Sequence, residues 1–113
     1  MIGKMERVYN KLVRDNIPDI IKDKGEEPVI RILNDDEYKI ELEKKLYEEY
    51  QEVISASGVD RLEELADMLE VIRALAKLEN NDLNDIIKIA DEKNIKRGSF
   101  NNKIFLERVI ESE

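Results

Sequence analysis

The chain has 113 residues, of which 41% are charged, and its formal net charge is −8 at pH 7. This length suits one domain with a modest hydrophobic core, and the negative charge argues against non-specific binding to a nucleic acid polymer. The sequence contains neither Cys nor His, which excludes disulfides, thiolate metal sites and His-ligated metals. Any bound metal must therefore be held by oxygen atoms, which favours Mg²⁺, Mn²⁺ or Ca²⁺.

The apolar runs are only a few residues long, so we expect no transmembrane segment and no membrane partner. Residues 1–6 contain no apolar block of the signal-peptide kind, and a cytoplasmic location is expected. Few aromatic residues and abundant Lys, Glu, Ile and Leu favour a mainly helical fold.

The first third of the sequence predicts one short helix and one strand. Residues 1–14 are expected to be irregular or extended. A helix then begins at about Asn16, has Pro18 in its first turn and stops at Gly25. The β-branched residues within 29–33 predict a short strand.

Three longer helices are predicted next, over about 34–57, 60–78 and 82–96. The first two each open with a capping-box-like signature, and Gly58 is the expected stop between them. Their connection is short, so these two helices should be antiparallel neighbours.

The last residues, 99–113, are ambiguous. Residues 103–109 fit either a strand paired with 29–33 or a last helix, and the strand is favoured. The predicted fold is a single mainly all-α domain over 1–113. It is a bundle of four to five helices around an antiparallel central pair, to which the strand alternative adds a minor two-stranded β element.

Two acidic pairs lie on the central helices: Glu49 with Glu52, and Glu64 with Asp67. A spacing of three residues places each pair on one helix face, so two facing helices can bring four carboxylates together. An all-oxygen metal site requires such a group. With 27 acidic residues in the chain, however, this spacing also arises by chance.

The apolar pattern separates these acids from the solvated ones. Glu49 lies in the apolar row Leu42-Leu46-Glu49-Val53-Ala56, and Glu64 heads the row Glu64-Met68-Val71-Leu75. The main stripe of the third helix is formed by Leu62, Leu65, Leu69, Ile72 and Ala76. Glu52 and Asp67 lie at the margins of the apolar faces, and Glu70 lies on the solvated side. Carboxylates on an apolar face cost free energy unless a cation compensates them. A divalent ion would do so, and a buried salt-bridge network with Lys45 or Arg61 is the alternative.

Two sets of cations could face the acids. Lys93 and Arg97 continue the apolar side of the fourth helix, where they either compensate the helix C-terminus or neutralise a phosphate chain. Lys11 and Arg14, near the start of the chain, form the second set.

Three sequence motifs resemble those of a known superfamily. In chain order they are Glu48-Glu49-x-x-Glu52, Glu64-x-x-Asp67 and Lys93-x-x-x-Arg97-Gly98. At these residues the chain resembles the all-α nucleoside triphosphate pyrophosphohydrolases, which include the MazG-like and phosphoribosyl-ATP pyrophosphohydrolase-like proteins. The opening Tyr9-Asn10-Lys11-Leu12-Val13-Arg14-Asp15-x-Ile17-Pro18 is similar to a small single-domain subgroup. The eleven residues between Glu52 and Glu64 are a short spacing for this group, with little room for a substrate-specific insertion.

The resemblance implies a Mg²⁺ ion, with Mn²⁺ as the alternative, held by Glu49, Glu52, Glu64 and Asp67. It also implies hydrolysis between the α and β phosphates of a nucleotide, which yields a nucleoside monophosphate and pyrophosphate. Without His, the general base is a carboxylate, with Glu48 or Glu49 as the candidate, or metal-bound hydroxide.

In the same resemblance, Lys93 and Arg97 would stabilise charge on the leaving pyrophosphate. The family also implies a homodimer or homotetramer, which suits a short chain with long apolar stripes. Two alternatives stay open: a phosphoribosyl-ATP pyrophosphohydrolase of histidine biosynthesis, and a non-catalytic helical interaction module whose acids form only salt bridges.

Overall fold

The computed structural model describes residues 5–112, which form four helices and no strand. The helices are α1 (Ile17–Asp23), α2 (Asp35–Ser55), α3 (Gly58–Leu78) and α4 (Leu83–Arg97). The prediction of a mainly all-α fold is therefore confirmed. None of these helices is long and apolar enough to cross a membrane.

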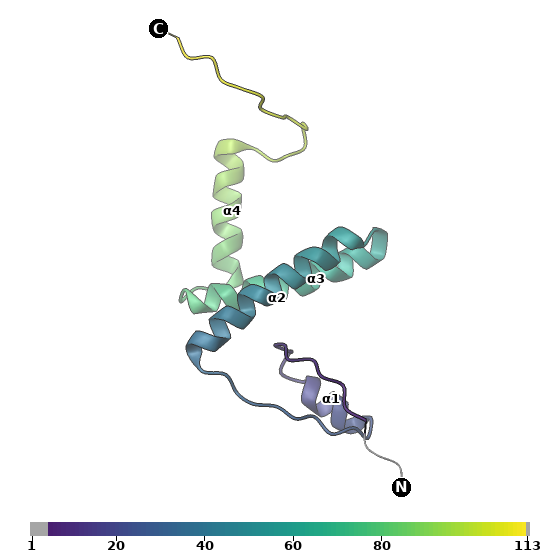
Figure 1. Cartoon of the computed structure of the whole chain (residues 1–113). Coiled ribbons are helices and arrows are strands. Elements are labelled where there is room, and N and C mark those ends of the chain that lie inside the picture. Colours follow the sequence, from purple (N-terminus) through teal and green to yellow (C-terminus); the bar gives the residue numbers. More distant parts are fainter. Residues whose placement is uncertain (1–4, 113) are drawn as a thin grey trace.

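The two predicted strands are wrong. Residues 29–33 and 103–109 have no regular structure and pair with no other segment of the described chain, and the alternative of a last helix over 103–109 does not form either. β-branched side chains favour a strand only where a neighbouring strand can accept its hydrogen bonds. In the described part of the chain these two segments lie far apart, with α2, α3 and α4 between them (Figure 1).

The predicted start of α2 is confirmed. The backbone N–H of Glu37 donates to Oδ1 of Asn34 at 2.9 Å, and the N–H of Asn34 donates to Oε1 of Glu37 at 3.4 Å. The two residues form a reciprocal capping box, which satisfies N–H groups that have no partner inside the helix. The hydrogen bond from Arg31 and the one from the Asn34 backbone both lower the pKa of the Glu37 carboxyl.

The connection between α2 and α3 has the predicted length of two residues, but it lies two residues earlier in the sequence than predicted. Helix α2 ends at Ser55, and Gly58 is the first residue of α3 rather than the stop of α2. Gly58 has a φ of 58°, in the left-handed region that glycine enters without steric cost, and this lets the chain reverse within a few residues. Nε of Arg61 donates to the carbonyl oxygen of Ala56 at 2.9 Å across the same turn.

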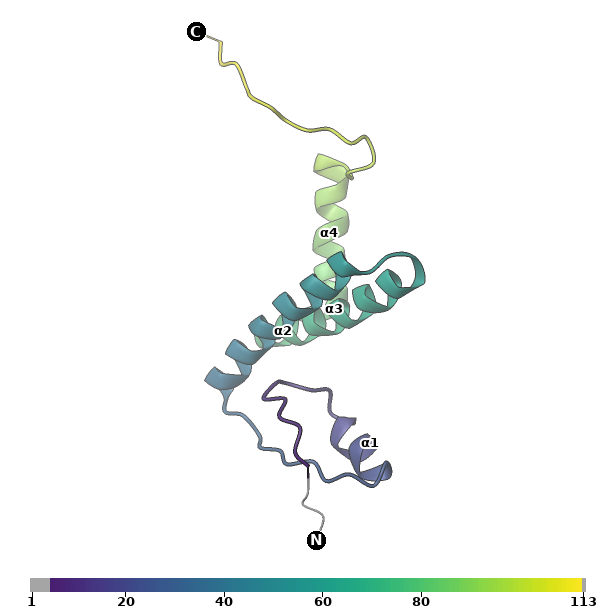
Figure 2. The ribbon, with the colours of Figure 1, turned by 45° about the vertical axis from the view of Figure 1, so that its right-hand side comes forward.

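Helices α2 and α3 form an antiparallel pair, which we call the hairpin (Figures 1 and 2). The buried residues of the described chain are all on its two helices: Leu42, Glu49, Val71 and Ala76. The first three belong to the two predicted apolar rows that contain the acids, so those rows face each other across the hairpin. The acids of these rows are therefore brought towards the same interface.

The main predicted stripe of α3 is largely exposed instead. Leu62 is 66% exposed, and Leu65 and Leu69 are also exposed. On α2, Tyr47 and Tyr50 are likewise exposed, with their rings stacked at a centroid distance of 6.1 Å. Each helix of the hairpin thus has two apolar faces, of which one packs within the chain and the other is uncovered.

The remaining elements lie on two sides of the hairpin. Helix α4 begins at a second capping box, between Asp82 and Asp85, and contains no buried residue. It leaves the C-terminal end of α3 at a steep angle, and residues 98–112 lead further away, first through a turn at 100–103 and then without regular structure (Figure 1). The N-terminal segment with α1 lies on the opposite side of the hairpin from α4 in both views (Figure 2).

Candidate metal centre

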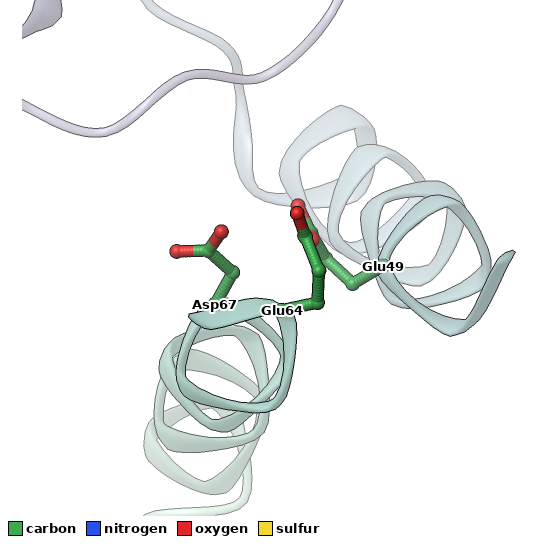
Figure 3. A group of neighbouring side chains, drawn as sticks. All are labelled: Glu49, Glu64 and Asp67. Atoms are coloured by element: carbon green, nitrogen blue, oxygen red, sulfur yellow. The ribbon is translucent and has the colours of Figure 1, made fainter. Parts of the chain in front are cut away.

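Three carboxylates meet at the interface of the hairpin. Glu49 extends from α2, while Glu64 and Asp67 extend from α3 on the facing side (Figure 3). One oxygen atom from each residue lies within 4.8 Å of the other two. The apolar row on each helix sets this arrangement, because packing one row against the other also brings the acids within those rows together.

Glu52, the fourth predicted ligand, is not part of this group of three. It is exposed on the margin of α2, although it lies close enough to Glu64 to raise the pKa of that carboxyl. The structure therefore gathers Glu49, Glu64 and Asp67 and leaves Glu52 beside them. Its role as a ligand stays a prediction.

Glu49 is the buried member of the group, with 7% of its surface exposed. Burial raises the pKa of its carboxyl, Lys45 opposes this shift, and the negative charges of Asp67, Glu48 and Glu64 add to it. Nζ of Lys45 lies 3.7 Å from Glu49 and 3.4 Å from Glu48, at the i,i+4 and i,i+3 spacings along α2. The net upward shift shows that one lysine does not fully compensate the buried carboxylate.

Glu64 is half-buried, and its pKa is also raised. Loss of solvation is the main cause, followed by repulsion from Glu52 and Asp67. Both carboxyls with raised pKa values therefore belong to the group of three. A proton or a cation would relieve the same unfavourable interaction at either of them.

Two cations from the segment before α1 reach the acids. Nη2 of Arg14 donates to Oδ1 of Asp67 at 2.7 Å, across 53 positions of sequence, and Nζ of Lys11 lies 3.5 Å from Glu48. The sequence marks both as possible phosphate ligands, but nothing in it indicates which acids they contact. Arg61, one of the two cations proposed for a salt-bridge network, instead donates to the carbonyl of Ala56.

Lys93 and Arg97 are not brought to the acids of the same chain. Both are exposed on the second half of α4, and they form no ion pair within residues 5–112. Helix α4 contacts α3 near Ile72–Glu79, whereas Glu64 and Asp67 lie in the first half of α3. Their proposed role with pyrophosphate stays a prediction.

The donor set fits a hard divalent cation. Three carboxylate oxygens are a suitable protein contribution for Mg²⁺ or Mn²⁺, which take their other ligands from water or a phosphate. The acids at or beside the group are Glu48, Glu49, Glu52, Glu64 and Asp67. The cations that ion-pair with them in the described residues number three, so at least two carboxylate charges lack a cationic partner.

Comparison with known proteins does not assign a family. No family model matches the chain, and no solved structure matches it. An uncharacterized protein of Mycolicibacterium smegmatis is similar to it, with 50% identity over 50 residues. The match covers 44% of this chain and 51% of that protein, so the chain spans about half the length of the relative it matches.

Proposed function

We propose that this protein is a Mg²⁺-dependent nucleoside triphosphate pyrophosphohydrolase, which releases a nucleoside monophosphate and pyrophosphate. The observation that carries this proposal is the meeting of Glu49, Glu64 and Asp67 from facing helices, with oxygens within 4.8 Å and one of the acids buried. An exposed acidic cluster is common without a metal, but a buried carboxylate beside two others is costly unless a cation joins them.

In this proposal Glu49, Glu64 and Asp67 hold the ion, and Glu52 adds a ligand from the margin. A bound Mg²⁺ ion would screen the negative charge of the triphosphate and make a coordinated water more acidic. Mn²⁺ is expected to substitute for it because it accepts the same oxygen ligands.

Glu48 is the better candidate for the general base, because Glu49 is committed to the metal. Glu48 is half-buried, adjoins the group of three and is held by Lys11 at 3.5 Å and Lys45 at 3.4 Å. A carboxylate held in position beside the metal can accept a proton from the attacking water.

Arg14 and Lys11 are the cations best placed to meet the substrate. They come from a segment without regular structure and lie directly over the acids through their ion pairs with Asp67 and Glu48. When a cation neutralises the acids, a phosphate chain becomes the stronger partner for the Arg14 guanidinium, which binds phosphate oxygens in bidentate fashion. The proposal includes a cytoplasmic homodimer or homotetramer.

A screen for pyrophosphate release tests the activity directly. Normal and modified nucleoside triphosphates, and phosphoribosyl-ATP, are each incubated with Mg²⁺ or Mn²⁺, and the products are identified by mass spectrometry. We expect release of pyrophosphate from at least one triphosphate. Turnover of phosphoribosyl-ATP alone would instead support the biosynthetic alternative.

Glu64→Gln tests the residue assignment. The loss of a direct ligand should reduce turnover by at least about 100-fold, since even second-shell changes around metals cost about 10–100-fold. Glu70→Gln is the matched control, because Glu70 is on the same helix and pairs only with Arg73, at 3.3 Å, in the described residues. Full activity of Glu64→Gln with unchanged helical circular dichroism would refute the metal assignment.

The ion pairs of Asp67 with Arg14 and of Glu49 with Lys45 also suit a helical interaction module with a structural salt-bridge network. Titration calorimetry with Mg²⁺ and a non-hydrolysable triphosphate separates the two proposals. Absence of binding to either would leave the interaction module as the better explanation.

A further inference from the structure

The chain exposes far more surface than a folded protein of its mass. Its accessible surface is 10949 Å² for a mass of 13.3 kDa, whereas a folded monomer of this mass exposes about 6,500 Å². Its radius of gyration is 20.1 Å, against about 13 Å for a compact domain of this length. The excess of about 4,500 Å² is several times the roughly 800 Å² that each partner buries in a standard interface. An area of this size points to association between copies rather than to a monomer.

Residues 99–112, which we call the tail, contribute strongly to this excess. Phe100 is 98% exposed, and the other exposed apolar residues of the tail are Ile104, Phe105, Leu106, Val109 and Ile110. Successive residues of an extended segment point to opposite sides, so Ile104 and Leu106 need cover on one side and Phe105 on the other. The tail leads away from the rest of its own chain (Figures 1 and 2).

The tail also differs from the rest of the chain in charge. Its two basic residues, Lys103 and Arg108, balance Glu107 and Glu111, and with the final Glu113 of the sequence the segment has a net charge of only −1, whereas the whole chain has a net charge of −8. Two acidic chains repel each other, and a nearly neutral apolar segment is the part that can approach a second copy at least electrostatic cost.

A matching surface lies between α3 and α4. A groove of about 280 Å³ is formed there by Ile72 and Leu75 of α3 with Ile86 and Ile89 of α4, and its lining is mainly apolar. Within the described residues, Glu79 is the charged member of this lining, and it could pair with Lys103 or Arg108. The groove therefore offers apolar contact and one negative charge to the tail, which carries apolar and basic side chains.

We propose that the tail of one chain docks in the α3–α4 groove of a second copy, with each chain filling the groove of the other. Ile86 and Ile89 are on the first half of α4, whereas the tail leaves the far end of that helix, about 15 Å further along. The reciprocal arrangement covers the tail and the groove in one interface. It does not depend on the proposed catalysis.

Disulfide trapping tests the exchange, and the absence of native Cys makes every introduced thiol unambiguous. One population carries a tail cysteine (Ile104→Cys, Leu106→Cys or Val109→Cys), and a second, size-tagged population carries Ile86→Cys or Ile89→Cys. After mixing and oxidation, we expect a species that contains one chain of each kind, because a disulfide requires Cα atoms within about 7 Å. Lys44→Cys, exposed on α2, is the matched control and should not link to the tail.

Two results would overturn this arrangement. One is failure of every tail–groove pair to link between chains. The other is closure of the Leu106→Cys/Ile86→Cys pair within a single chain at high dilution, which would show that the tail folds back on its own groove.

Removal of the tail gives an independent measurement. A chain that ends at Gly98 should keep its helical circular dichroism, while light scattering should show a dissociation constant raised about 100-fold or more, as expected when several buried apolar anchors are lost. Association as tight as that of the full chain would refute the proposal.

Discussion

Two parts of the molecule differ in how their apolar residues are covered. One is the hairpin of α2 and α3, and the other is the C-terminal part, which consists of α4 and residues 98–112. Both are rich in Ile and Leu, yet the hairpin contains all four buried residues of the described chain and the C-terminal part contains none. In the hairpin a short turn brings two apolar rows together within one chain. The C-terminal part packs against its own chain only where the start of α4 contacts α3, within the described residues, and we propose that a second copy covers its remaining apolar residues.

This difference should make metal binding and association between copies independent of each other. The group of Glu49, Glu64 and Asp67 belongs entirely to the hairpin, so binding of a metal should not require the tail. Association should require the tail but none of these acids. Substitutions in one part are therefore expected to leave the property of the other part intact.

The largest expected effect is on the stability of the hairpin. Leu42 is 3% exposed, and Leu42→Ala should lower the free energy of unfolding by about 2–5 kcal/mol, because it removes transfer free energy and leaves a cavity. Ile40→Ala is the control on the same helix, where Ile40 is exposed, and should cost about 1 kcal/mol or less. Urea denaturation at several protein concentrations measures both. Similar losses for the two variants would show that the hairpin does not have its core at Leu42.

The next effect distinguishes a metal centre from a salt-bridge network. The pKa of Glu49 is raised by burial, so its folded value lies above its unfolded value. Its contribution to stability is then fully present below the unfolded pKa and is lost as pH rises through the folded pKa. Glu49→Gln should remove this loss of stability at rising pH. Without metal, the variant should be at least as stable as the natural chain at neutral pH.

The same substitution should abolish stabilisation by Mg²⁺. In the natural chain, saturating Mg²⁺ should add about 2.7 kcal/mol at a concentration of 100 Kd, and only above the pH at which the carboxyls ionise. Thermal unfolding between about pH 4 and 8, with and without Mg²⁺, measures this, with Glu70→Gln as the control. If Glu49→Gln instead destabilises the metal-free protein and Mg²⁺ has no effect on either chain, the acids form a salt-bridge network.

The sequence predicted much of what depends on local spacing, although the capping box expected at the start of α3 does not form. The capping box of Asn34 and Glu37 and the acid-containing rows of α2 and α3 are set by residues within a few turns, and the structure confirms them. Periodicity also identified the stripe with Leu62, Leu65 and Leu69 as apolar. It could not indicate which of two apolar faces packs within the chain, because that choice depends on the angle at which the helices meet.

Contacts across long sequence separations were not predictable. Arg14 and Asp67 are 53 positions apart, and the segment around Arg14 has no regular spacing that would aim it at one acid. The strand predicted over 29–33 failed for a related reason, since local propensity cannot supply the partner strand that pairing requires. Lys93 and Arg97 share a helix face, but the position of α4 in the fold, and not its sequence, decides what that face contacts.

The smallest expected effect compares the two capping boxes, which have the same chemistry in the two parts of the molecule. Asn34→Ala and Asp82→Ala each remove a side-chain acceptor that caps the first turn, at a cost of about 1 kcal/mol. Asn34 caps a helix that holds two buried residues, so its loss should lower the free energy of global unfolding. Asp82 caps a helix with none, and in the isolated chain its loss should appear as faster hydrogen exchange in α4 with little change in global unfolding. A full global cost for Asp82→Ala that grows with protein concentration would instead show that α4 unfolds cooperatively with the hairpin once a second copy covers it.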